Sequence, residues 1–180
     1  SASQRIPVGE VIGLMGLFGV LCFSMLALRA GDAPLPRAIL SRTMLIRSLF
    51  EIIGRIFYAL AVALTPISVA AAILQATPLV VVLGAALIFR ERVGLRRWLL
   101  ILLGFAGVLT ILRPGLGGFS ALSALALIAM IGFAGRDLAT RAAPLSLSNA
   151  QLGVLGFIVL ALSGSIMLAV TGGAQWPDAP

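Results

Sequence analysis

The composition of the 180-residue chain excludes a water-soluble fold. Hydrophobic residues make up 61% of the sequence and charged residues 11%, and the mean hydropathy is +1.15. Soluble domains hold about 45–50% apolar and about 25% charged residues. The net charge of +7 comes from thirteen arginines and no lysine. Because these arginines lie mainly in short gaps between apolar runs, they indicate membrane topology rather than a face that binds nucleic acid.

Six apolar stretches follow one another along the chain. Each can form a helix that crosses a bilayer core of about 30 Å. A helix satisfies its own backbone hydrogen bonds in lipid, and the stretches lack the alternation of a membrane β-barrel. The sequence therefore predicts an all-α, polytopic transmembrane bundle of about six helices. The stretches are residues 11–28, 45–64, 67–89, 98–112, 119–135 and 152–171.

The arginines alternate between the gaps that separate these stretches. The second gap contains no arginine, and the fourth gap and the N-terminal stub contain one each, Arg113 and Arg5. The positive-inside rule then predicts cytoplasmic first, third and fifth gaps and periplasmic chain ends. Those three gaps hold or adjoin Arg29, Arg37, Arg42, Arg47, Arg90, Arg92, Arg96, Arg97, Arg136 and Arg141.

The residues that most enzymes and ATP-driven pumps require are missing. Cys22 is the single cysteine and there is no histidine, so the sequence predicts no internal disulfide and no His/Cys metal site. We also find no phosphate-binding loop and no nucleophile elbow. The sequence therefore predicts a protein without catalytic residues, metal or cofactor.

The second stretch carries the charges that point most directly to a function. Arg47, Glu51 and Arg55 are spaced i, i+4 and i+8 along one helical face, and Tyr58 follows about one turn later. Ionisable groups at membrane depth usually face the bundle interior or a water-filled pathway. For Arg47 we favour a head group that reaches the cytoplasmic interface. For Glu51 and Arg55, a substrate pathway and a structural ion pair are both open.

The third stretch contains a predicted helix break with polar side chains. Gln75, Thr77 and Pro78 interrupt an otherwise apolar run. Proline lacks a backbone donor and frees a carbonyl one turn earlier, and transporters use such breaks to build midplane binding sites. The alternative is a packing kink in which Thr77 bonds its own backbone. We include these three residues with Glu51, Arg55 and Tyr58 in a predicted substrate pathway.

Two charge clusters are predicted at cytoplasmic helix ends. Glu91 and Arg92 follow the third stretch, and Arg136 and Asp137 follow the fifth. Anchoring at the membrane interface explains both clusters, and a gate built from salt bridges is the alternative. Glycine pairs at helix-contact spacing also predict close helix packing, because small residues let backbones approach in lipid. They are residues 9/13, 16/19, 104/107 and 153/156.

The sequence of residues 59–79 strongly resembles the EamA-type permeases of the drug/metabolite transporter superfamily. It contains the hairpin with Thr65-Pro66, an alanine-rich run and Thr77-Pro78. Further similar motifs occur at residues 47–51, 89–92, 104–108, 113–115 and 136–141. Arg90 stands where the family usually has glycine, and Met15 roughly where its second helix has arginine.

The resemblance implies ten helices in two inverted five-helix repeats, of which this chain matches helices two to seven. We therefore expect a fragment, with residues 1–113 as the last four helices of the first repeat and residues 114–180 as the first two helices of the second.

The predicted function is secondary-active transport of small organic metabolites or drugs by alternating access in a bacterial inner membrane. The predicted partners are a small-molecule solute and the lipid bilayer, with no nucleic acid. Glu51 is the candidate for proton coupling, with Arg55 setting its proton affinity, and a homodimer is open. A non-transporting membrane scaffold or partner subunit is the alternative, and a membrane-embedded enzyme ranks third.

Overall fold

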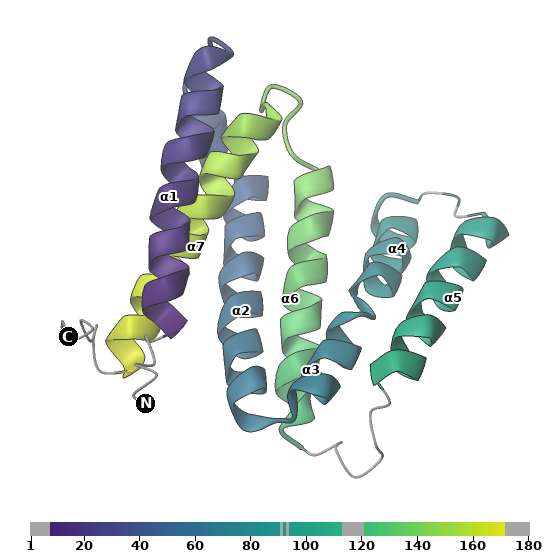
Figure 1. The fold of residues 1–180 in the computed structure, drawn as a ribbon. Coiled ribbons are helices and arrows are strands. Elements are labelled where there is room, and N and C mark those ends of the chain that lie inside the picture. Colours follow the sequence, from purple (N-terminus) through teal and green to yellow (C-terminus); the bar gives the residue numbers. More distant parts are fainter. Residues whose placement is uncertain (1–7, 91, 93, 113–120, 172–180) are drawn as a thin grey trace. The chain divides into compact units, whose positions relative to one another are not determined.

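The structure is a computed structural model that describes residues 8–90, 92, 94–112 and 121–171 (Figure 1). Every regular element in these ranges is a helix, which confirms the predicted all-α class. The elements are α1 (Val8–Arg29), η1 (Arg37–Leu40), α2 (Arg42–Leu64), α3 (Ile67–Leu74), α4 (Thr77–Ile88), α5 (Leu95–Leu112), α6 (Ser123–Arg141) and α7 (Asn149–Thr171).

Four helical spans in the described part are long and apolar enough to cross a membrane. They are Gly9–Arg29, Ile67–Ile88, Ser123–Arg141 and Asn149–Ala169. The span Ile67–Ile88 joins α3 and α4, which meet at the predicted break. Helix α2 is also long enough, but it carries four charged side chains and is not among these four spans. The structure therefore supports a multi-pass membrane protein.

The helix boundaries differ from the predicted apolar stretches at charged ends. Helix α2 begins at Arg42 rather than residue 45, and α6 continues to Arg141 rather than ending near residue 135. Arginine forms helix readily, whereas hydropathy alone ends a stretch at the first charge. The extension of α6 matters for function, because it places Arg136 and Asp137 inside a helix.

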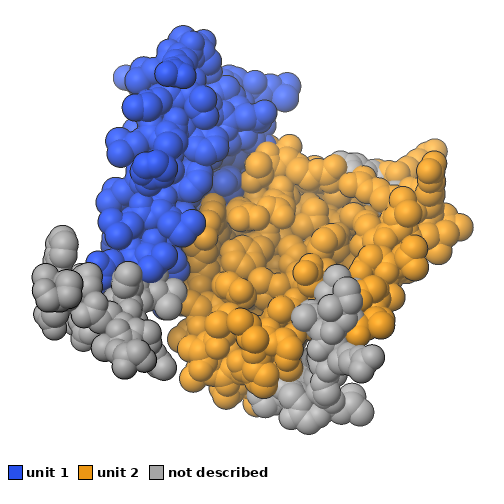
Figure 2. All heavy atoms as spheres, in the orientation of Figure 1, with its two compact units in different colours: residues 1–48, 143–180 blue, residues 49–142 orange. Residues whose placement is uncertain are grey.

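Residues 1–48 and 143–180 form one compact unit, whose main contact joins α1 and α7 (Figures 1 and 2). Glycines let the two helices approach closely: a Cβ added at Gly16 would lie 2.5 Å from the backbone nitrogen of Ala161. One added at Gly164 would lie 2.5 Å from the nitrogen of Gly13. Phe23 and Phe157 pack beside this contact with ring centroids 5.2 Å apart.

The start of α7 is fixed by a capping box and by a contact with a distant loop. The backbone nitrogen of Ser148 donates to Gln151 Oε1 (2.9 Å), and the nitrogen of Gln151 donates to Ser148 Oγ (3.4 Å). Gln151 Nε2 donates to the carbonyl of Ala33 (2.9 Å), 118 residues away in sequence. These bonds hold the loop after α1 against the beginning of α7.

Residues 49–142 form the second unit, which includes most of α2 and all of α3 to α6 (Figure 2). Its core contains small and medium apolar residues from α2, α3 and α6. Helices α2 and α3 are joined by the predicted two-residue turn, in which Thr65 Oγ1 donates to the carbonyl of Ala61 (2.6 Å). The core residues are Ala61, Val69, Ala70, Ile73, Ala126 and Met130.

Helices α2 and α6 also meet through glycines. A Cβ added at Gly132 would lie 2.7 Å from the Cα of Gly54, and one added at Gly135 would lie 2.7 Å from the ring of Phe50. Such distances require the two backbones to be nearly in contact. This contact sets the register that brings the charged residues of the two helices together.

Four of the predicted glycines have a close neighbour on another helix. A Cβ added at Gly9, Gly16, Gly19 or Gly153 would come within 3.0 Å of that neighbour. A Cβ at Gly13, Gly104 or Gly107 would meet nothing within 4 Å in the described part of the chain. Spacing alone therefore does not identify the glycines at which a side chain would meet a neighbouring helix.

Candidate functional site

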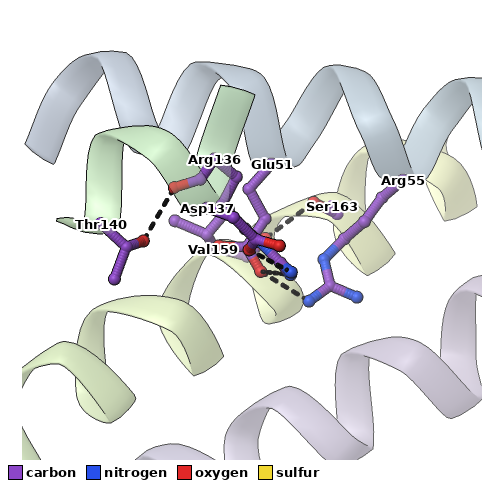
Figure 3. Close-up of polar contacts among 7 residues, drawn as sticks. All are labelled: Glu51, Arg55, Arg136, Asp137, Thr140, Val159 and Ser163. Atoms are coloured by element: carbon purple, nitrogen blue, oxygen red, sulfur yellow. Dashed lines mark hydrogen bonds and ion pairs between the residues drawn. The ribbon is translucent and has the colours of Figure 1, made fainter. Parts of the chain in front are cut away.

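Two pairs of opposite charges meet where α2 packs against α6 (Figure 3). Helix α2 contributes Glu51 and Arg55, and α6 contributes Arg136 and Asp137. Figure 3 shows the guanidinium groups of Arg55 and Arg136 turned toward the carboxylate of Glu51. The structure thus brings together two residues that the sequence assigned to the pathway and two that it assigned to an interface anchor or gate.

The tight ion pairs in this cluster lie within each helix. Arg55 Nη2 lies 2.6 Å from Glu51 Oε1, which is a hydrogen-bonded pair one turn apart on α2. On α6, Asp137 Oδ1 accepts hydrogen bonds from Arg136 Nη2 (2.7 Å) and Arg136 Nε (2.9 Å). The contact between the helices is longer, with Arg136 Nη1 3.8 Å from Glu51 Oε1. It is an ion pair without hydrogen-bond geometry.

Burial distinguishes Glu51 from the other three residues. Its side chain is 3% exposed, whereas those of Arg55 and Arg136 are each 28% exposed and that of Asp137 is 41% exposed. A buried carboxylate requires compensating charges, and the two arginines supply them. The cluster therefore has a buried carboxylate, Glu51, at its centre. The partly exposed side chains of Arg55, Arg136 and Asp137 surround it.

Aromatic rings border the cluster. The ring of Tyr58 on α2 packs edge-on against Phe133 on α6, with centroids 6.2 Å apart. The guanidinium carbon of Arg136 lies 5.5 Å from the centroid of Phe133, within the range of a cation–π contact. Tyr58 thus contacts the same ring as Arg136, and its place in a substrate pathway stays a prediction. The i, i+3 spacing of Phe133 and Arg136 was the available signal.

Arg47 is buried in the structure. It is only 8% exposed, and a Cβ added at Gly156 of α7 would lie 3.3 Å from Arg47 Nη2. The absence of a side chain at residue 156 leaves room for the guanidinium group. Arg47 is therefore packed inside its unit rather than extended into solvent, and its depth in the membrane stays a prediction.

The predicted helix break lies between α3 and α4, at Gln75 and Ala76. Pro78 cannot donate to the carbonyl of Leu74, but Thr77 Oγ1 does so instead. The carbonyl freed by proline is thus already hydrogen-bonded, as in the alternative that the sequence analysis gave for Thr77. Gln75 and Pro78 are exposed, and Thr77 is half-buried.

The second predicted anchor cluster is described only in part. Glu91 lies outside the described residues, and Arg92 is exposed. Arg90 has a φ of 53°, the left-handed region that glycine adopts without a steric penalty. That conformation gives a physical reason for a glycine at this position, where this chain has arginine.

A comparison with known families identifies the family of this chain. Residues 1–113 match the EamA-like transporter family, which covers more than half of the chain. The chain belongs to this family. EamA members are membrane transporters, so a small-molecule solute and a lipid environment follow for this chain as well. Neither the curated proteins nor the solved structures include a significant match. The assignment of residues 114–180 to a second repeat stays a prediction.

Proposed function

We propose that this EamA member transports small organic metabolites or drugs by alternating access, driven by a secondary gradient, in a bacterial inner membrane. The observation that carries the proposal is the buried carboxylate of Glu51 between Arg55 and Arg136, at a contact between two helices of a transporter-family chain. Charged groups at membrane depth are costly, and bundles keep them mainly where a pathway uses them.

In this proposal the α2–α6 cluster and the α3–α4 break have different roles. Arg55, Arg136 and Asp137 are partly exposed, so they are available to polar groups of a solute. Gln75 is exposed, and its side chain has no hydrogen-bond partner among the described residues, so it is available as a further polar contact. The carbonyl of Leu74 has no such role, because Thr77 occupies it.

The orientation that we propose follows from the arginine pattern. The gaps that begin after α1, α4 and α6 are cytoplasmic, and both ends of the chain are periplasmic. The exposed Arg29, Arg92 and Arg141 lie in or at the ends of those gaps and support this direction.

Cysteine labelling in proteoliposomes tests the proposal without knowledge of the substrate. Tyr58→Cys and Gln75→Cys are introduced separately into full-length protein in which Cys22, the single cysteine of this sequence, is replaced by serine. A membrane-impermeant maleimide is then applied from either side. We expect labelling of both positions from both sides, because alternating access opens one pathway in turn to each compartment. Labelling from neither side would contradict transport through this region.

Proton coupling through Glu51 is a separate part of the proposal. Glu51→Gln retains the size of the side chain but cannot carry a proton between compartments. The labelling rate at Tyr58→Cys is divided by the rate at Leu145→Cys, a fully exposed position, to remove the pH dependence of the thiol itself. We expect Glu51→Gln to abolish the pH dependence that remains in this ratio. An unchanged pH dependence would remove Glu51 from coupling and leave the transport proposal intact.

A non-transporting scaffold or partner subunit is the second candidate. The pairing within the charged cluster and the bond from Thr77 to the carbonyl of Leu74 favour it, because a sealed bundle also satisfies its buried polar groups. This candidate predicts that neither introduced cysteine is labelled. A homodimer, which the sequence leaves open, is tested in the same preparation by size-exclusion chromatography with light scattering.

A further inference from the structure

The four charges at the α2–α6 contact alternate in sign along a chain of ion pairs. In order they are Arg55, Glu51, Arg136 and Asp137. The two outer links are short, at 2.6 Å on α2 and 2.7 Å on α6, and the central link between the helices is 3.8 Å. Each helix therefore brings its own neutral pair to the contact.

This arrangement matters when the helices move apart. Breaking a buried ion pair is costly chiefly because a charge is left without compensation in a medium of low dielectric constant. If Glu51 and Arg136 had only each other, separation of α2 and α6 would expose two such charges. Here Arg55 stays with Glu51 on α2, and Asp137 stays with Arg136 on α6.

We infer that Arg55 and Asp137 are positioning residues that make the Glu51–Arg136 contact reversible, so that α2 and α6 separate and rejoin. The inference rests on the proposed function, in which some helix contact must open and close. It differs from a plain salt-bridge gate, in which Glu51 and Arg136 alone hold the helices together.

Neutralising variants distinguish the two mechanisms. Asp137→Asn removes the same-helix partner of Arg136, and Arg55→Gln removes the 2.6 Å hydrogen bond that Arg55 donates to Glu51 on α2. Both variants are expected to hold the helices closed. The same-helix double variants E51Q/R55Q and R136Q/D137N restore neutrality on each helix and are expected to restore opening.

A double variant with one substitution on each helix should have the opposite effect to the same-helix double variants. E51Q/R136Q removes the central ion pair but leaves Arg55 on α2 and Asp137 on α6, two opposite charges without local partners. We expect this variant to stay closed. A plain gate predicts the reverse, because deleting both partners of the gate would release the helices.

The readout is the distance between nitroxide labels on α2 and α6, measured by pulsed electron paramagnetic resonance. Leu60→Cys and Leu127→Cys are suitable positions, since the two leucines are 42% and 46% exposed and lie outside the cluster. We expect two distances in the parent protein and an open fraction reduced about tenfold, or about 1.4 kcal/mol, in Asp137→Asn. Asp137→Glu retains the charge and should behave like the parent. If Asp137→Asn does not fold, Arg55→Gln makes the same test.

Three results would overturn the inference: one distance in the parent, no change in any single variant, or opening restored by E51Q/R136Q but not by the same-helix pairs. The cysteine labelling experiment decides the proposed function independently. Labelling of Tyr58→Cys from both sides with a single α2–α6 distance would refute the inference alone. Two distances without labelling would refute the proposed transport pathway alone.

Discussion

The α1–α7 contact and the α2–α6 contact both depend on glycines, yet they differ in what surrounds those glycines. Between α1 and α7, Gly16 and Gly164 bring two backbones together beside the rings of Phe23 and Phe157. Between α2 and α6, Gly54 and Gly132 do the same next to a chain of four charges.

The difference teaches how one chain can hold a fixed contact and a movable one. Close packing of small residues in lipid stabilises both contacts. Charges that are neutralised on their own helix give a contact whose polar groups remain satisfied after a shift. The other irregular features, the α3–α4 break and the left-handed Arg90, also lie in the unit that contains α2–α6.

Neutralising the centre of the charged contact should have the largest effect on stability. Glu51→Gln leaves Arg55 and Arg136 facing each other without their shared carboxylate, and we expect a loss of about 3 kcal/mol in unfolding free energy. Thermal unfolding in detergent, followed by circular dichroism, measures it. A variant as stable as the parent would mean that the charges contribute nothing to the α2–α6 contact. The proposed difference between the α1–α7 and α2–α6 contacts would then be wrong.

The glycine contact between α1 and α7 should respond to a single methyl group. Gly16→Ala places a Cβ 2.5 Å from the backbone of Ala161, so the helices must move apart, at a cost of about 2 kcal/mol. Gly13→Ala is the matched control, because its Cβ would meet nothing within 4 Å. Equal melting temperatures for the two variants would show that α1 and α7 are not closely packed at Gly16.

The helix break should depend on a hydroxyl group rather than on proline alone. Thr77→Val leaves the carbonyl of Leu74 without the donor that replaces the missing N–H of Pro78, and we expect a loss of about 1 kcal/mol. Thr110→Val is the control, because Thr110 Oγ1 bonds the carbonyl of Ala106 within a regular helix (2.8 Å). The difference between the melting temperatures of the two variants measures the contribution of the Thr77 hydroxyl group at the break. Equal melting temperatures would show that the Leu74 carbonyl has another donor.

The smallest expected effect is a stabilisation. Arg90→Gly removes a side chain from a residue at φ 53°, and we expect a gain of about 0.5–1 kcal/mol. Arg92→Gly also removes one arginine from the same loop and serves as the control. If both variants change the melting temperature alike, charge rather than backbone conformation is responsible.

Hydropathy and helix spacing predicted much of this fold, including the short turn between α2 and α3, the break near Pro78 and the common face of Glu51 and Arg55. They did not predict the partnership of Glu51 with Arg136. The apolar pattern ends near residue 135, so Arg136 and Asp137 resembled residues of a loop or an interface. Their place at the contact depends on the register of α2 against α6, which the approach of Gly54 and Gly132 sets.

Arg47 is a second residue whose contacts could not be predicted from the sequence. Its position near the start of α2 suggested a head group at the membrane surface, whereas the structure buries it beside Gly156 of α7, where the missing side chain leaves room for the guanidinium group. Contacts between segments far apart in sequence carry no local signal in either residue.

The most direct test of the account is a comparison of the two contacts in one protein by pulsed electron paramagnetic resonance. One label pair joins α2 and α6 through Leu60→Cys and Leu127→Cys, and the other joins α1 and α7 through Leu17→Cys and Leu162→Cys, at residues that are 58% and 51% exposed. The account predicts two distances for α2–α6 and one for α1–α7. A single distance for α2–α6, or two for both pairs, would contradict it.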